Sequence, residues 1–224
     1  MPRLHFKSVK IISFLACLGL FTIFFSLISK FPFRALESHA SDPPSLSTPY
    51  SSFSIYQDSG LVAFPDKTGS GNETDPYVIR DLEIPIPYES FGIRITETTK
   101  HLHIINCTLT GNYTDSGLMF DNVRNVKVIN CSISTRTANY GNIYLTECVN
   151  SSFINNTINA HWIPRTSDVY IGVTDGVAMI NSTNITFHNN TISSNRMRGF
   201  NFRDSNNCKD IYLSNNNLIG CGIY

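Results

Sequence analysis

The chain has little charge and few of the residues from which metal and acid–base sites are built. Of its 224 residues 15% are Asp, Glu, Lys or Arg, and it holds six histidines and one tryptophan. From Ser41 onward, 12 basic residues stand against 16 acidic ones, a net charge of −4. Because phosphate binding needs a basic footprint, we expect no nucleic acid among the partners.

Asparagine is absent from the first 71 residues, and 23 asparagines follow from Asn72 onward. Asn is unfavourable in helix interiors and favourable in turns. Its abundance excludes a helical repeat and indicates a chain that turns often.

A polar cluster rich in asparagine recurs five times, each time before an aliphatic residue. The copies are residues 106–109 (NCTL), 130–133 (NCSI), 155–158 (NNTI), 189–192 (NNTI) and 215–218 (NNNL). A glycine and a short apolar alternation precede each copy, at Gly92, Gly117, Gly141, Gly176 and Gly199. Counted to Gly222, the glycines are 25, 24, 35, 23 and 23 residues apart. Self-similarity at such a period is the signature of a solenoid.

The unit that starts at Gly117 shows how one repeat folds. Leu118 and Phe120 flank Met119, and Val126 and Val128 flank Lys127. Such alternation predicts half-buried strands. Three short strands separated by turns fill a coil of about 24 residues, and successive coils stack about 4.8 Å apart as parallel ladders. The sequence therefore predicts an all-β parallel solenoid.

The lead-in to the repeats carries a resemblance. Residues 69–79 read GSGNETDPYVI, a loop followed by a strand, and a second strand is predicted near Leu82. This run, followed by Gly-aliphatic and Asn-x-Thr/Ser-aliphatic units, resembles exported right-handed parallel β-helix proteins. Within these it is most similar to the NosD-like group, whose repeats belong to the carbohydrate-binding and sugar-hydrolase β-helix class.

The resemblance implies a right-handed parallel β-helix of about six coils over residues 55–224. It implies little about activity. The class includes polysaccharide lyases, hydrolases, epimerases, copper-site accessory proteins and non-catalytic surface modules.

The amino-terminal segment predicts export. Residues 11–28 carry no charge, whereas Arg3, Lys7 and Lys10 precede them and Lys30 and Arg34 follow. A cationic start and an apolar run are typical of a signal peptide, and the length also reaches that of a membrane-spanning helix. Residues 1–34 are thus a cleaved signal or a signal-anchor, behind which the remaining chain lies outside the cell. Residues 35–54, rich in Ser and Pro, are predicted to be a flexible linker.

Equivalent positions of stacked coils lie above one another, which gives the asparagines a structural purpose. Asn156, Asn190 and Asn216 are expected to form a ladder of side-chain amides, each both donor and acceptor. Cys107 and Cys131 occupy the same position in earlier repeats. A packed pair of free thiols, a disulfide and a metal site are the alternatives for them. No cofactor and no metal centre are predicted, because ligands at close spacing are too few.

One repeat is longer than the others. Between Gly141 and Gly176 it holds about ten additional residues, and insertions in solenoids cluster on a binding face. An aromatic ring beside Arg and Asp suits a sugar ring and its hydroxyls. The alternative is that Trp162 packs on the coil. The candidate ligand-binding residues are His161, Trp162, Arg165, Asp168, Tyr170 and Asp175.

No catalytic constellation is evident. A lyase, hydrolase or epimerase could use Asp175 or Asp204 with an arginine, although Arg196, Arg198 and Arg203 are interpreted as a solvated patch. A role in copper-site assembly rests only on the NosD-like resemblance. We expect instead a non-catalytic surface module that binds polysaccharide or another surface protein.

The carboxyl-terminal end shows no cap. Gly222 opens a further repeat two residues before the end. Either further coils follow, or the bare coil associates end to end with a second copy or a partner.

Overall fold

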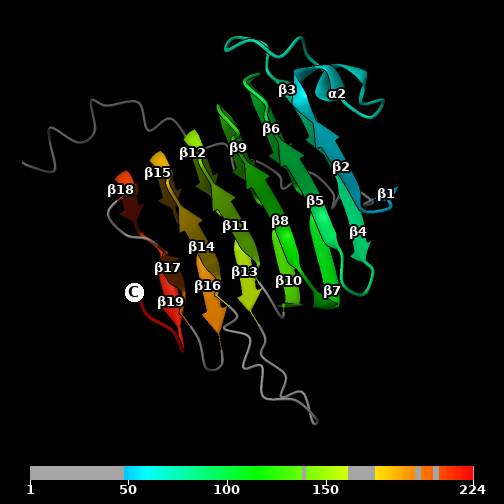
Figure 1. Cartoon of the computed structure of the whole chain (residues 1–224). Coiled ribbons are helices and arrows are strands. Elements are labelled where there is room, and N and C mark those ends of the chain that lie inside the picture. The colour runs from blue at the N-terminus through cyan, green and yellow to red at the C-terminus, as the bar shows by residue number, and fades with distance from the viewer. Residues whose placement is uncertain (1–47, 138–139, 161–174, 195–197, 204–206, 224) are drawn as a thin grey trace, which may run out of the picture. The chain divides into compact units, whose positions relative to one another are not determined.

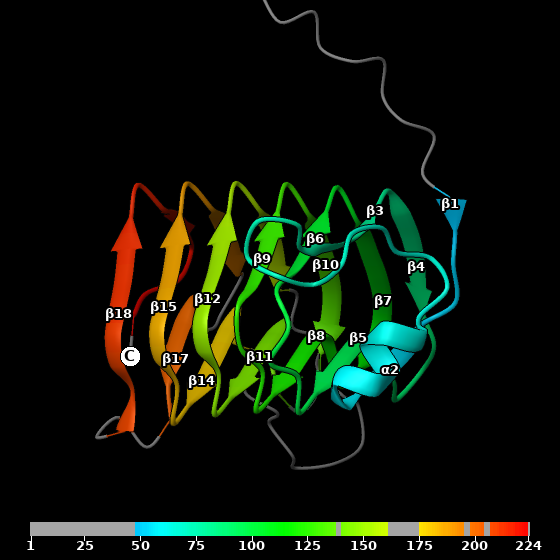
Figure 2. The same cartoon turned by 90° about the horizontal axis from the view of Figure 1, so that it is seen from above.

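The chain folds as a parallel β-helix of three sheets (Figures 1 and 2). The computed structural model describes residues 48–223, apart from 138–139, 161–174, 195–197 and 204–206. These residues belong to one compact unit, Ser45–Tyr224. Neighbours within each sheet are three strands apart in sequence and parallel, so each coil contributes one strand to each sheet. The all-β parallel solenoid is therefore confirmed.

Sheet A has seven strands. In spatial order they are β1 (Thr48–Pro49), β4 (Leu82–Ile86), β7 (Thr108–Thr114), β10 (Ser132–Thr137), β13 (Thr157–Ala160), β16 (Thr191–Ser194) and β19 (Asn217–Ile219).

Sheets B and C have six strands each. Sheet B runs β17 (Phe200–Phe202), β14 (Val177–Ile180), β11 (Ile143–Thr146), β8 (Ser116–Asp121), β5 (Phe91–Thr96) and β2 (Phe53–Tyr56). Sheet C runs β18 (Lys209–Ser214), β15 (Thr183–His188), β12 (Val149–Ile154), β9 (Val126–Ile129), β6 (Leu102–Ile105) and β3 (Tyr77–Arg80).

The core fills the interior of the coils. Leu118, Phe120, Val126 and Val128 are fully buried, whereas Met119 is only partly buried, as the alternation predicts. Phenylalanines stack between coils: the rings of Phe153 and Phe187 lie 4.6 Å apart and nearly parallel. Offset stacking of this kind adds to the burial of their apolar area.

The two residues that open each asparagine motif have different roles. The first lies at the turn from sheet C to sheet A with a positive φ, which Asn tolerates better than other L-residues. The φ values are 54° at Asn106, 54° at Asn130, 57° at Asn155, 55° at Asn189 and 54° at Asn215.

The second residue points inward and joins the coils. Asn190 Oδ1 accepts hydrogen bonds from the backbone N–H of Asn156 at 2.9 Å and from its amide at 3.0 Å. Asn216 Oδ1 does the same for Asn190, with both distances 2.9 Å. Each Nδ2 also donates to a carbonyl of the preceding coil, as Asn190 does to Phe153 at 2.9 Å. The ladder thus supplies acceptors for the turn N–H groups of Asn156 and Asn190.

The cysteines of the column replace an amide with a thiol. Asn156 Oδ1 accepts from the N–H of Cys131 at 2.8 Å, and Cys131 Sγ accepts from the N–H of Cys107 at 3.4 Å. Cys131 Sγ also donates to Ile104 O at 3.6 Å. All cysteines in the described part of the chain are free.

A third buried thiol lies at the turn from sheet B to sheet C. Cys148 is fully buried there, and burial raises the pKa of its thiol to about 12. A thiol of that pKa holds its proton at neutral pH and is a poor nucleophile.

The first coil begins earlier than predicted. The proposed linker, 35–54, contains β1 and the start of β2. Tyr50 donates its N–H to Glu83 O at 2.8 Å, and the rings of Phe53 and Phe64 lie 4.7 Å apart. Aromatic side chains within a Ser/Pro-rich stretch thus extend the core, and the predicted boundary at residue 54 was wrong.

A helix that the sequence analysis did not predict covers this end of the coils. Helix α2 (Gln57–Ala63) follows β2 and lies at this end of the coils (Figure 2). Its Leu61 is fully buried. Asp58 in its first turn accepts hydrogen bonds from Thr99 N and Thr99 Oγ1, both at 2.7 Å, and from Lys100 N at 3.3 Å. The helix is thereby attached to the following coil.

The glycine alignment needs one correction. Ile143 pairs with Leu118, so Asn142 rather than Gly141 stands at the position of Gly117. At Gly117 a Cβ would lie 2.5 Å from Ile133 Cγ2, which explains the glycine. Asn142 is buried there, and its side chain bonds Thr135 Oγ1 at 2.8 Å. Equivalent positions are therefore separated by 25, 25, 34, 23 and 23 residues.

The last coil is less covered than the others. Leu213 is partly exposed, whereas its neighbour in register, Phe187, is fully buried. Ile219 and Ile223 are 50% and 53% exposed.

Residues 11–28, which were predicted to be a signal or anchor, lie outside the described residues. Within the described ranges, no helix has the length and apolarity needed to cross a membrane.

The ladder yields a first prediction. Asn190→Ala leaves the N–H of Asn156 without its acceptor and removes the amide hydrogen bond to the carbonyl of Phe153, and an unsatisfied buried group costs about 1–3 kcal/mol. We expect urea unfolding of the full chain to show a loss on the order of 3 kcal/mol. Asn217→Ala, on the exposed face of sheet A, is the control and should change stability by less than about 0.5 kcal/mol. Equal effects would contradict the ladder's role.

The cap yields a second prediction. Burial acts to raise the pKa of Asp58, but the hydrogen bonds from Thr99 and Lys100 outweigh it and the pKa is lowered. A lowered folded pKa adds stability above the unfolded value of about 3.9, and this stability is lost as pH falls through the folded pKa. Asp58→Asn should therefore destabilise the chain at pH 7 and converge with the wild type in acid. A difference independent of pH would refute this linkage.

Candidate ligand-binding face

The outer face of sheet B has a side-chain composition that differs from coil to coil. Outward positions alternate with the buried ones: Tyr144 is partly exposed between Ile143 and Leu145, which are fully buried. Aligned with Tyr144 in register are Arg94 and Met119, which are partly exposed, and Ala178 and Asn201, which are buried. This variation contrasts with the repetitive interior.

Three partly exposed rings and two guanidinium groups lie next to one another on this face. We call Phe91, Arg94, Tyr140, Tyr144 and Arg203 the aromatic band. The rings of Tyr140 and Tyr144 are 4.9 Å apart, and those of Phe91 and Tyr140 are 6.4 Å apart. Arg94 Cζ lies 5.4 Å from the Phe91 ring, and Arg203 Cζ lies 6.0 Å from that of Tyr144. The guanidinium groups are within range of cation–π attraction.

At one end of the band, Asp175 holds a cluster together. Its Oδ1 accepts from Arg198 Nε at 3.0 Å, and its Oδ2 accepts from Asn201 Nδ2 at 2.7 Å and from Arg203 Nη2 at 3.2 Å. The side chain of Asp175 has no exposed surface, while those of Arg198 and Arg203 are 31% and 30% exposed. Burial makes such a charge costly unless it is paired, and here it is paired twice.

This geometry changes two interpretations of the sequence. The solvated arginine patch was wrong for Arg198 and Arg203, because both form ion pairs with Asp175. Asp175 itself is enclosed by donors, so it supports the face and does not offer a free carboxylate. The other candidate residues, His161, Trp162, Arg165, Asp168 and Tyr170, lie outside the described residues, as does Asp204.

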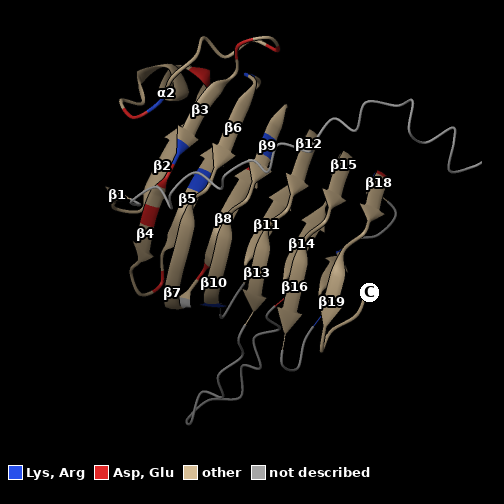
Figure 3. Ribbon diagram, turned by 180° about the vertical axis from the view of Figure 1, so that it is seen from behind, with Lys and Arg blue, Asp and Glu red and all other residues tan. Residues whose placement is uncertain are grey.

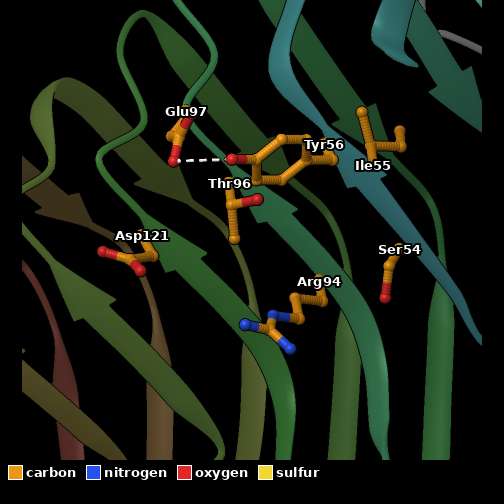
Figure 4. A pocket seen from close by; sticks show the side chains of 7 residues that line it. All are labelled: Ser54, Ile55, Tyr56, Arg94, Thr96, Glu97 and Asp121. Carbon is orange, nitrogen blue, oxygen red and sulfur yellow. Dashed lines mark hydrogen bonds between the residues drawn. The ribbon is translucent and has the colours of Figure 1, made fainter.

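A pocket of about 340 Å³ lies near the other end of the band. Its lining comes from three successive coils and consists of Ser54, Ile55, Tyr56, Arg94, Thr96, Glu97 and Asp121. Figure 4 shows Glu97 and Asp121 on one side, Ser54 on the other, and the Tyr56 ring extending toward Glu97. Tyr56 donates its hydroxyl to Glu97 Oε1 at 3.0 Å, and this hydrogen bond raises the pKa of Tyr56.

The charges within the strands are concentrated in the amino-terminal coils. Strands β11 to β17 contain no charged residue, and Figure 3 shows β11 to β16 without the red and blue that mark β4, β5 and β9. Arg94 of β5 is therefore one of few charges on the strands of this sheet. Within the described part of the chain, no three His, Cys, Asp or Glu side chains gather as a metal site would require.

The aromatic band was not predicted from the sequence, although a signal for it exists. Arg94 and Tyr144 each lie two residues after the position occupied by Gly92 and Asn142, where the alternation points outward. The misplaced glycine at residue 141 hid this correspondence. The pairing of Asp175 with Arg198 and Arg203 had no local signal, since it depends on which side chains the coils bring into register.

The three stacked sheets define a solenoid of the parallel β-helix class, and the outer face of sheet B differs from the rest of it in composition. Residues 91–224, more than half of the chain, match the family described as right handed beta helix region. The chain belongs to this family, which confirms the right-handed winding. No curated protein and no solved structure gives a significant match.

The Asp175 cluster yields a third prediction. Asp175→Asn keeps the size of the side chain but removes the counter-charge of Arg198 and Arg203. We expect a loss of about 2–4 kcal/mol in urea unfolding, because a paired, buried charge network is broken. Asp210→Asn is the matched control: Asp210 is exposed with φ 53°, a conformation in which Asn is well tolerated. A loss no larger than the control's would show that the cluster contributes nothing.

Proposed function

We propose that the chain is an exported β-helix module that binds glycans along the outer face of sheet B. The observation that carries the proposal is the aromatic band, in which Phe91, Tyr140 and Tyr144 lie in a continuous row. Rings with partly exposed faces are suited to stacking on the C–H faces of sugar rings. Polar groups beside them, here Arg94 and Arg203, supply directed hydrogen bonds to hydroxyls.

The arrangement also supplies preorganisation. Arg203 is held by Asp175 and by the carbonyl of Tyr140, at 3.2 and 3.4 Å. A guanidinium held in this way loses little side-chain entropy when a ligand arrives. Aromatic residues on strands also lose little side-chain entropy on binding. The outer face of sheet B therefore suits a long polymer that makes many weak contacts.

A glycan is favoured over a protein partner by the distribution of apolar surface. Among the described residues, the exposed large hydrophobic side chains are Tyr56, Val62, Tyr88, Tyr212, Ile219 and Ile223, which are spread over different elements. Protein interfaces usually present a contiguous apolar core. The resemblance of the repeats to the carbohydrate-binding and sugar-hydrolase β-helix class, with its NosD-like group, agrees with a sugar ligand.

A binding role is favoured over catalysis because Asp175 lacks a free oxygen at the surface. Glycoside hydrolysis requires two carboxyl groups that reach the substrate. Both oxygens of Asp175 already accept hydrogen bonds, and the side chain is fully buried.

The export half of the proposal rests on residues 11–28, an uncharged run between basic flanks. Such a segment directs the chain out of the cell, as a cleaved signal or as a single membrane anchor. A carbohydrate-binding wall is useful where polysaccharides are found.

The fourth prediction tests the wall. Tyr144→Ala should weaken retention on polysaccharides about tenfold, since a stacking contact contributes about 1 kcal/mol beyond its buried area. Affinity electrophoresis against xylan, laminarin, soluble cellulose and polygalacturonate measures this. Tyr212→Ala, an exposed tyrosine on sheet C, is the control and should bind as the wild type does. Retention by none of these polymers, or equal retention of both variants, would refute glycan binding at this face.

A further inference from the structure

We infer that the pocket at the amino-terminal end of the aromatic band is a subsite for one neutral pyranose residue, with Asp121 as acceptor and Arg94 as donor. The inference rests on the proposed function and names the substrate class of that face.

The floor of the pocket is a small grid of outward side chains. Ser54 is in register with Arg94, and Tyr56 with Thr96 and Asp121. Parallel strands lie about 4.8 Å apart, and outward residues of one strand are about 6.6 Å apart. The grid therefore measures about 10 by 7 Å, the size of a single sugar ring. A volume of about 340 Å³ is at the small end of ligand sites and fits one such ring.

The polar groups of the pocket divide into engaged and available ones. Both carboxylate oxygens of Glu97 already accept a hydrogen bond, from Tyr56 Oη and from Gln57 Nε2, each at 3.0 Å. These bonds fix the Tyr56 ring at the edge of the pocket. Within the described ranges, no side chain donates to the carboxylate of Asp121, and no carboxylate forms an ion pair with Arg94.

The pocket offers one hydrogen-bond acceptor, Asp121, and one donor, Arg94. This pair suits a ligand whose groups can both donate and accept hydrogen bonds. Each sugar hydroxyl can donate to Asp121 and accept from Arg94, so a pair of adjacent hydroxyls can satisfy the two side chains at once. Figure 4 shows Asp121 and Arg94 on either side of the space below Thr96. The Ser54 and Thr96 hydroxyls extend the same pattern.

The charge of the pocket selects against acidic sugars. Glu97 and Asp121 bring two negative charges and Arg94 one positive charge, so the lining carries a net charge of −1. The carboxylate of a uronate would be repelled by Asp121 and by the net negative charge of the lining, whereas a neutral pyranose is not repelled. The subsite should therefore accept glucose-, galactose- or mannose-type residues and reject glucuronate.

The test uses the full chain and simple methyl glycosides. Saturation-transfer NMR and calorimetric titration compare methyl glucoside, galactoside and mannoside with methyl glucuronide and glucosamine. We expect at least one neutral glycoside to bind, and to bind about tenfold more tightly than methyl glucuronide. Equal or tighter binding of methyl glucuronide or glucosamine would overturn the neutral specificity.

Matched variants locate the binding. Asp121→Ala and Arg94→Ala should each weaken the neutral glycoside about tenfold, because each removes a charge-assisted hydrogen bond. Glu73→Ala and Arg124→Ala remove one exposed charge of the same sign elsewhere and should have no effect. Both pocket residues are on the surface, and circular dichroism checks that the variants remain folded. Unchanged affinity in both pocket variants would overturn the subsite.

The failure of this inference is separable from that of the proposed function. If polysaccharides are retained through Tyr144 while Asp121→Ala and Arg94→Ala bind as the wild type, the wall binds glycans and the pocket is not a subsite. If methyl glycosides bind through Asp121 while no polymer is retained, the pocket is confirmed as a sugar subsite and polymer binding along sheet B is refuted.

Discussion

The side-chain ladder at the turn from sheet C to sheet A is the constraint on which the rest of the structure depends. A stacked coil can close only if the N–H and C=O groups of its turns find partners. At this corner backbone N–H groups of the next coil bond the carbonyls of Asn156 and Asn190, whereas the N–H groups of these two residues are bonded by side chains. Asn156, Asn190 and Asn216 each accept from the N–H of the residue below them in the ladder and donate to a carbonyl of that preceding coil. Cys131 continues the column with weaker sulfur contacts. Since leaving a buried polar group unpaired is costly, the ladder favours one register for the coils from Cys107 to Asn216.

Register in turn decides what the outer walls present. Because the interior side chains must stack on those of the neighbouring coils, the residue type can vary only at outward positions. On sheet B these outward positions hold aromatic rings and guanidinium groups. Phe91 and Tyr140 come from different coils and meet only because the coils are stacked in phase, whereas Tyr144 lies four residues after Tyr140. The pocket beside Arg94 arises in the same way, from three coils. A regular scaffold thereby carries an irregular surface, on which ligand binding is proposed.

Much of the fold was predictable, because period-2 alternation and repeated turn residues report local constraints. The strands around Leu118 and Val126 follow directly from that pattern. Helix α2 was not predictable in this way, because its seven residues include Gly60. Its stability comes from the burial of Leu61 in the core and from the hydrogen bonds that Asp58 accepts from the next coil. The boundary of the first coil and the role of Asn142 were missed for a related reason: each is settled by contacts with a neighbouring coil.

The sequence by itself determined the class of architecture, the approximate number of coils and the inward positions, because these depend on spacing along one chain. The asparagine column was also readable, since identical residues recur at the period of the repeat. Only the tertiary structure decided that Asp175 is buried between Arg198 and Arg203, and that Arg94 and Asp121 share a pocket. Such groups are distant in sequence, and stacking in register, which no local pattern encodes, brings them together.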